Sequence, residues 1–66
     1  MIRQRVFSSR ISSVGWNNNV LEVEFKNGAV YQYYNVTHSE YLHFINSSSL
    51  GRAISIIDKT HPYHRV

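Results

Sequence analysis

The sequence predicts a small α+β domain, a three-stranded antiparallel β-meander followed by two short helices packed on one face. Apolar and charged residues alternate strictly from Leu21 to Lys26, which is the pattern of a strand with one buried and one wet face. An Asn27-Gly28 pair then precedes an aromatic segment, as in a β-hairpin. Beyond Tyr34 the apolar spacing becomes that of amphipathic helices.

Length and composition indicate one domain without covalent cross-links. A chain of 66 residues buries only about 60% of its unfolded surface, so the core is thin. The sequence contains no cysteine, which excludes disulfides and thiolate metal sites. It has neither the apolar run of a signal peptide nor a membrane span, so we expect a cytoplasmic protein without membrane contact. The expected segments are an extended arm (1–9), the meander (11–34), two helices (38–57) and a tail (58–66).

The hairpin turn admits two registers. A two-residue turn at Asn27-Gly28 places Val23 opposite Gln32 and buries the amide. A three-residue loop with Gly28 in the left-handed bulge position places Val23 opposite Tyr31 and inverts the return strand. We favour the second register, because a buried amide without partners costs about 1–3 kcal/mol.

This register decides the environment of the tyrosines. Leu21 lies opposite Tyr33, so Tyr31 and Tyr33 are predicted to be core residues whose hydroxyls reach the rim. Gln32 lies beside Glu22 in solvent. The open face of the return strand then carries Val30, Gln32 and Tyr34.

The first strand is predicted from Ile11 to Trp16. Gly15 within it indicates a bulge or a close backbone approach. Three asparagines at 17–19 form the following loop, because asparagine tolerates the left-handed conformation.

Capping residues mark both helices. Thr37 and Glu40 fit a capping box, and the helix should run to about Asn46. Ser49 caps the second helix. The expected buried stripes are His38, Tyr41, Leu42, Phe44 and Ile45 in the first helix and Leu50, Ala53, Ile54 and Ile57 in the second. Both stripes should pack on the sheet face of Leu21, Val23 and Phe25.

No motif in the chain predicts catalysis or a cofactor. Glu22 and Glu24 alternate on a wet strand face. His61 and His64 resemble a metal-ligand pair but lack an evident third ligand. The serine clusters have no base at a motif spacing and are interpreted as turn and cap residues. We therefore expect no catalytic residues, no metal and no cofactor.

RNA binding is the function class that the composition favours. The formal charge is +3, and aromatic residues are interleaved with cations as in single-stranded nucleic-acid binders. The candidate contacts are Arg10, Arg52, Lys59 and Arg65 for phosphate, and Trp16, Tyr34 and Tyr63 for base stacking.

The motif pattern resembles the KTSC domain family. The resemblance runs over Leu21-x-Val23-x-Phe25-x-Asn27-Gly28-x-Val30-Tyr31-x-Tyr33, then Val36, Ser49-x-Gly51 and Pro62-Tyr63. The family is named after the C-terminus of certain lysyl-tRNA synthetases and also occurs as small bacterial proteins, so the resemblance implies RNA or tRNA as partner and a structural role for Tyr31, Tyr33, Asn27 and Gly28. The chain departs from the pattern at Thr37, where the family has proline, and at His61, where it has an aromatic residue.

The rival hypothesis is a protein-interaction module or homodimer. In a three-stranded meander, residues 29–34 form an edge strand without lysine, proline or inward charge, which leaves it open to pairing with a partner. Alternatively the arm with Val6 and Phe7, or the tail after Pro62, covers this edge within one chain.

Overall fold

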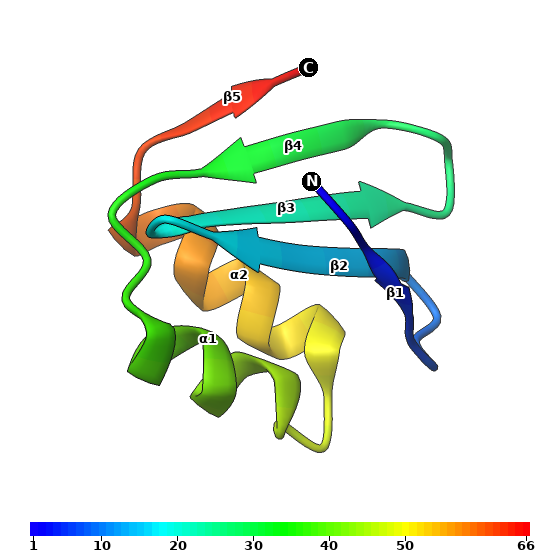
Figure 1. Cartoon of the computed structure of the whole chain (residues 1–66). Helices are drawn as coiled ribbons and strands as arrows, with labels where there is room; N and C mark the ends of the chain where they lie inside the picture. The colour runs from blue at the N-terminus through cyan, green and yellow to red at the C-terminus, as the bar shows by residue number, and fades with distance from the viewer.

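The computed structural model describes all residues, 1–66, and has an α+β fold with two layers, a sheet and a pair of helices (Figure 1). Both helices lie on the same side of the sheet. The elements in chain order are β1 (Gln4–Arg5), β2 (Ile11–Asn17), β3 (Val20–Phe25), β4 (Val30–Tyr33), α1 (His38–Ile45), α2 (Leu50–Thr60) and β5 (Tyr63–Arg65).

The sheet has five antiparallel strands in the order β1-β2-β3-β4-β5, which corrects the expected three. The arm contributes β1, where Gln4 lies opposite Val14, and the tail contributes β5, where Tyr63 lies opposite Tyr33. Residues 29–34 are therefore not an edge, because β5 pairs with β4 along its length (Figure 1). The tail after Pro62 covers the strand, and the N-terminal arm pairs at the opposite edge of the sheet.

The hairpin adopts the three-residue loop, so the favoured register is confirmed. Tyr31 lies opposite Val23 and Gln32 lies opposite Glu22. The Phe25 amide donates to the Ala29 carbonyl at 2.8 Å, and Gly28 has φ +93°, a conformation that favours glycine.

Gly15 marks a close backbone approach, and the irregular pairing of β2 lies elsewhere, between Ile11 and Ser13. A Cβ at Gly15 would stand 2.5 Å from the Ile2 carbonyl oxygen, so only glycine lets β1 reach its position. The asparagine loop is as expected, with Asn18 and Asn19 both at positive φ.

Both predicted caps are present. The Thr37 hydroxyl accepts the Glu40 amide at 3.1 Å and Glu40 accepts the Thr37 amide at 3.0 Å, which completes the capping box. Ser49 accepts the Arg52 amide at the start of α2. The second helix continues to Thr60 rather than ending near Ile57, since nothing in the sequence between them breaks a helix before Pro62.

The core lies between the sheet and the helices. Its buried residues are Ile11, Val14, Leu21, Val23, Tyr33, Val36, Phe44, Leu50, Ile54 and Ile57. The predicted stripe of α2 is confirmed, whereas that of α1 is rotated. Phe44 is its one buried residue, Tyr41 and Ile45 pack at the margin, and His38 and Leu42 are exposed.

Candidate nucleic-acid interface

A row of partly exposed aromatic rings lies on the helix side of the sheet, where β3, β4 and β5 meet. We call Phe25, Tyr31 and Tyr63 the aromatic row. The ring centroids of Phe25 and Tyr31 are 5.6 Å apart and edge-on, and those of Tyr31 and Tyr63 are also 5.6 Å apart. Tyr63 is 53% exposed, and the other two rings are half-buried. The row thus offers aromatic surface to solvent.

Tyr33 anchors the aromatic row from beneath. Its ring is 1% exposed and lies 5.6 Å from that of Tyr63. Its hydroxyl donates to an Asp58 carboxylate oxygen at 2.6 Å, so the sheet and α2 are joined under the row. Burial, and then this hydrogen bond, raise the pKa of Tyr33 far above its ordinary value, which keeps the hydroxyl neutral. Tyr33 is therefore a structural residue.

Cations flank the aromatic row. Arg65 lies opposite Tyr31 in the β4–β5 register and so on the same side of the sheet. The Arg10 guanidinium donates from Nη1 to the Gly51 carbonyl at 3.0 Å and to the Ser55 hydroxyl at 3.1 Å. These contacts hold Arg10 against α2. The Arg10 carbonyl accepts the amide of Lys26, the residue after Phe25.

Lys59 is a further exposed cation of the predicted set. It follows Asp58 in the last turn of α2 and is exposed. The salt bridges of the structure involve only Arg3 and His61 among the basic residues. Arg10, Lys59 and Arg65 therefore retain charge that a phosphate can neutralise.

Three of the predicted contact residues lie away from the aromatic row. The Trp16 indole donates to the Val36 carbonyl at 2.8 Å, and its ring lies 4.8 Å from that of His38, so it packs against the start of α1. The Tyr34 hydroxyl donates to the Gln32 amide oxygen at 3.2 Å. Arg52 lines a groove between the helices and, together with Arg10, a second hollow beside the first turn of α2. The seven candidates therefore do not form one site.

Phe25 and Tyr31 were predicted to be core residues, but both pack at the margin of the core and contribute to the aromatic row. Tyr31 is half-buried rather than enclosed. The predicted register already put Tyr31 on the helix side, but the extent of helix cover over β4 depends on how α2 crosses the sheet. No residue pattern encodes that crossing.

The opposite sheet face carries a row of polar side chains that are hydrogen-bonded to one another, which we call the ladder. Arg3 donates to Glu22 at 3.1 Å, and the Gln32 amide donates to the other oxygen of the same carboxylate at 2.8 Å. Tyr34 continues the ladder to Gln32. Gln32 was expected in solvent but is half-buried and bonded. Within these contacts, the Arg3 cation and the Glu22 carboxylate are paired with each other.

His61 and His64 do not form a ligand pair. The His61 ring bridges the Tyr34 carbonyl, 3.0 Å from Nδ1, and a Glu40 oxygen, 2.9 Å from Nε2. His64 lies in β5 opposite Gln32. The structure contains no cluster of three histidine, cysteine or acidic side chains placed for a metal ion.

The capping box predicts an acid-sensitive contribution to stability. Hydrogen bonds from the Thr37 amide, and next from its hydroxyl and from His61, hold the pKa of Glu40 below its ordinary value. The stabilisation is present above the unfolded-chain pKa of about 4.3 and is lost as pH falls through the lower folded-state pKa.

We therefore expect the free energy of unfolding of the native chain to fall with acidification below about pH 5 more steeply than that of Glu40→Gln. Denaturant unfolding at a series of pH values measures both slopes. Thr37→Ala should flatten the profile as well, since it removes the hydroxyl from the box. Parallel profiles for the native chain and Glu40→Gln would contradict the assignment.

Comparison with known proteins places this architecture in a family. A five-stranded antiparallel sheet with two helices on one face defines a small two-layer α+β domain. The model of the KTSC domain matches residues 7–59, and the chain belongs to the KTSC domain family. The chain is similar to a KTSC domain protein from Yersinia pestis of known crystal structure, with 33% identity, a TM-score of 0.90, and coverage of 98% of this chain and 96% of that one.

Two negative findings complete the comparison. No curated protein matches the chain. Neither helix has the length and apolar character needed to cross a membrane.

Proposed function

We propose that this KTSC domain is a non-enzymatic RNA-binding module that holds single-stranded RNA on the aromatic row. The observation that carries the proposal is that Tyr63 is 53% exposed beside the half-buried Phe25 and Tyr31, with Arg65, which has no ion pair, on the same side of the sheet. Base stacking on an aromatic side chain contributes about 1–3 kcal/mol per base. Arg10, Lys59 and Arg65 then neutralise the adjacent phosphates.

The proposed surface suits unpaired bases better than a duplex. Tyr63 projects from the last strand of the sheet and is the most exposed ring of the row, so one ring face is open to a splayed base. Paired bases expose only their edges, and single-stranded segments are the usual targets of stacking side chains. No step of catalysis is assigned, because Asp58 and Glu40, the acids nearest the row and the groove, are engaged in structural hydrogen bonds.

Titration of fluorescently labelled single-stranded RNA and of tRNA, followed by anisotropy at several salt concentrations, tests the proposal. Three phosphate contacts predict that log K falls with log salt with a slope of about −2. Absence of binding at low salt, or binding without a negative slope, would refute RNA as the ligand.

Tyr63→Ala is expected to weaken RNA binding by about 5- to 100-fold, the equivalent of one lost stacking interaction. Phe7→Ala is the matched control, because Phe7 is an equally apolar, fully exposed ring outside the row. Equal affinities of the two variants would show that the row is not the stacking platform. Circular dichroism verifies that both variants remain folded.

A further inference from the structure

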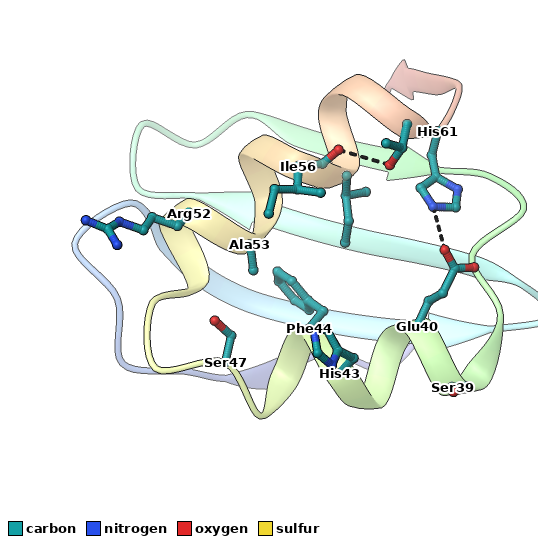
Figure 2. Close-up of a pocket in the computed structure, with 11 residues that line it drawn as sticks. Ser39, Glu40, His43, Phe44, Ser47, Arg52, Ala53, Ile56 and His61 are labelled. Carbon is teal, nitrogen blue, oxygen red and sulfur yellow. Dashed lines mark hydrogen bonds and ion pairs between the residues drawn. The ribbon is translucent and has the colours of Figure 1, made fainter.

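A groove separates α1 from α2 on the side of α2 that faces away from Ser55 and Asp58. Its volume is about 460 Å³, and its apolar lining consists of Phe44 of α1 with Ala53, Ile56 and Ile57 of α2. Figure 2 shows Phe44 between the two ends of the groove, with Arg52 at one end and the Glu40–His61 pair at the other. Ile56 is 64% exposed at the rim. The groove is therefore an apolar surface that the chain itself leaves uncovered.

The charged groups at the two ends of the groove differ in how many hydrogen bonds their side chains already make. One Glu40 oxygen accepts from the Thr37 amide and hydroxyl, at 3.0 and 3.1 Å. The other oxygen contacts His61 at 2.9 Å. The Arg52 guanidinium has no hydrogen bond or ion pair, since only its backbone amide is bonded, to Ser49. The rim thus carries an unpaired cation, Arg52, at one end and, at the other, a carboxylate whose two oxygens are already hydrogen-bonded, with His43 beside the groove as a further polar group.

We propose that the groove between α1 and α2 docks an acidic amphipathic segment of a partner protein, with its apolar side chains on Ala53 and Ile56, above the buried Phe44, and a carboxylate on Arg52. Helix-in-groove recognition requires an apolar floor and a rim that selects charge, and both are present. The inference rests on other residues than the aromatic row, because Ala53 and Ile56 line the groove whereas Asp58 is bonded to Tyr33 beneath the row.

The dimensions favour a protein segment over the other occupants. Eight residues of α1 extend about 12 Å, which matches roughly two turns of a docked helix. Small-molecule pockets bury most of their ligand's surface, whereas Ile56 in the lining of this groove is itself 64% exposed. The one benzene ring of the groove, Phe44, is buried and offers no face for stacking. RNA therefore gains little there.

A synthetic peptide is the probe for this inference. It has about 14 residues, the length at which an isolated helix becomes marginally stable. It carries leucine on one helix face and glutamate on the flanks, and its C-terminus is amidated. A second peptide replaces every glutamate with lysine. Titration of the isotope-labelled full chain is followed by nuclear magnetic resonance. We expect the acidic peptide to shift the amide signals of Phe44, Arg52, Ala53 and Ile56, and the basic peptide to bind at least about fivefold more weakly.

Two pairs of variants test which residues bind the peptide. Arg52→Glu should weaken the acidic peptide by about fivefold or more, while Lys59→Glu, an exposed cation on α2 outside the groove, should not. Ile56→Ser should weaken it by several-fold, while Leu42→Ser should not, since Leu42 is 43% exposed on α1 outside the groove.

Four results would overturn the inference. The first is equal binding of the acidic and basic peptides. The second is equal loss in Lys59→Glu and Arg52→Glu, which would indicate attraction by net charge alone. The third is the absence of shifts at millimolar acidic peptide. A single-stranded oligoribonucleotide that shifts the groove residues, when the acidic peptide does not, would assign the groove to nucleic acid and equally reject a protein partner.

Discussion

Replacing Tyr33 by alanine is expected to lower the free energy of unfolding by about 3–5 kcal/mol, the range for truncating a buried aromatic residue. The ring is 1% exposed and packs in the core cluster, and its hydroxyl joins β4 to Asp58 of α2. A domain of this size has roughly that much stability in total. The variant should therefore be largely unfolded at room temperature, as measured by thermal denaturation and near-ultraviolet circular dichroism.

A conservative series separates the ring from its hydroxyl. Tyr33→Phe keeps the packing but leaves the half-buried Asp58 without its donor, so we expect a loss of about 1–3 kcal/mol. Tyr34→Phe is the matched control, because its hydroxyl makes a 3.2 Å bond at the margin of the sheet and its loss should matter less. Native stability of Tyr33→Ala, accompanied by lost RNA affinity, would show that Tyr33 is a binding residue instead.

The register of the hairpin and both helix starts could be predicted because each depends on neighbouring residues. The cost of burying Gln32 was enough to choose between the two turns, and the choice agrees with the pairing of Glu22 and Gln32. The capping box of Thr37 and Glu40 is similarly local. Such signals act within a few residues, and tertiary packing did not override them here.

The outer strands could not be predicted for the opposite reason. Only two residues of β1 and three of β5 pair with the sheet, so neither segment is long enough for alternation to be visible. Their conformation is imposed by the unpaired edges of β2 and β4, which offer backbone donors and acceptors to whichever segment reaches them. Gly15 was the one local sign of such contact at the β2 edge.

The candidate RNA contacts were likewise only partly predictable from the sequence. The sequence identifies Arg10, Lys59, Arg65 and Tyr63 as suitable chemistry, but equally Trp16, which the structure holds against α1. Only the crossing of α2 over the sheet determines which rings stay uncovered. Composition therefore suggests a class of ligand to test, whereas the choice of candidate residues that share one surface required the fold.

Removal of residues 62–66 is expected to convert the chain into a form that self-associates. The tail donates the Val66 amide to the Val30 carbonyl at 2.9 Å and accepts the Tyr34 amide on the Pro62 carbonyl at 2.8 Å, with three paired residues of β5 between them. Without it, β4 presents unpaired backbone groups and carries no lysine, proline or inward charge to deter a second strand. Loss of the three cross-strand pairs should also lower stability by about 1–3 kcal/mol.

Light scattering and sedimentation over a range of concentrations measure the association of the truncated chain. The full-length triple variant Tyr63→Ala, His64→Ala, Arg65→Ala is the matched control, because it keeps the backbone cover of β4 while losing the side chains, and it should scatter less than the truncated chain. Adding Val30→Lys to the truncated chain should restore the monomer, since lysine guards an edge strand. A truncated chain that stays monomeric at every concentration, with an unchanged free energy of unfolding, would show that β5 does not protect β4. Water would then satisfy the backbone groups of β4 as well as β5 does.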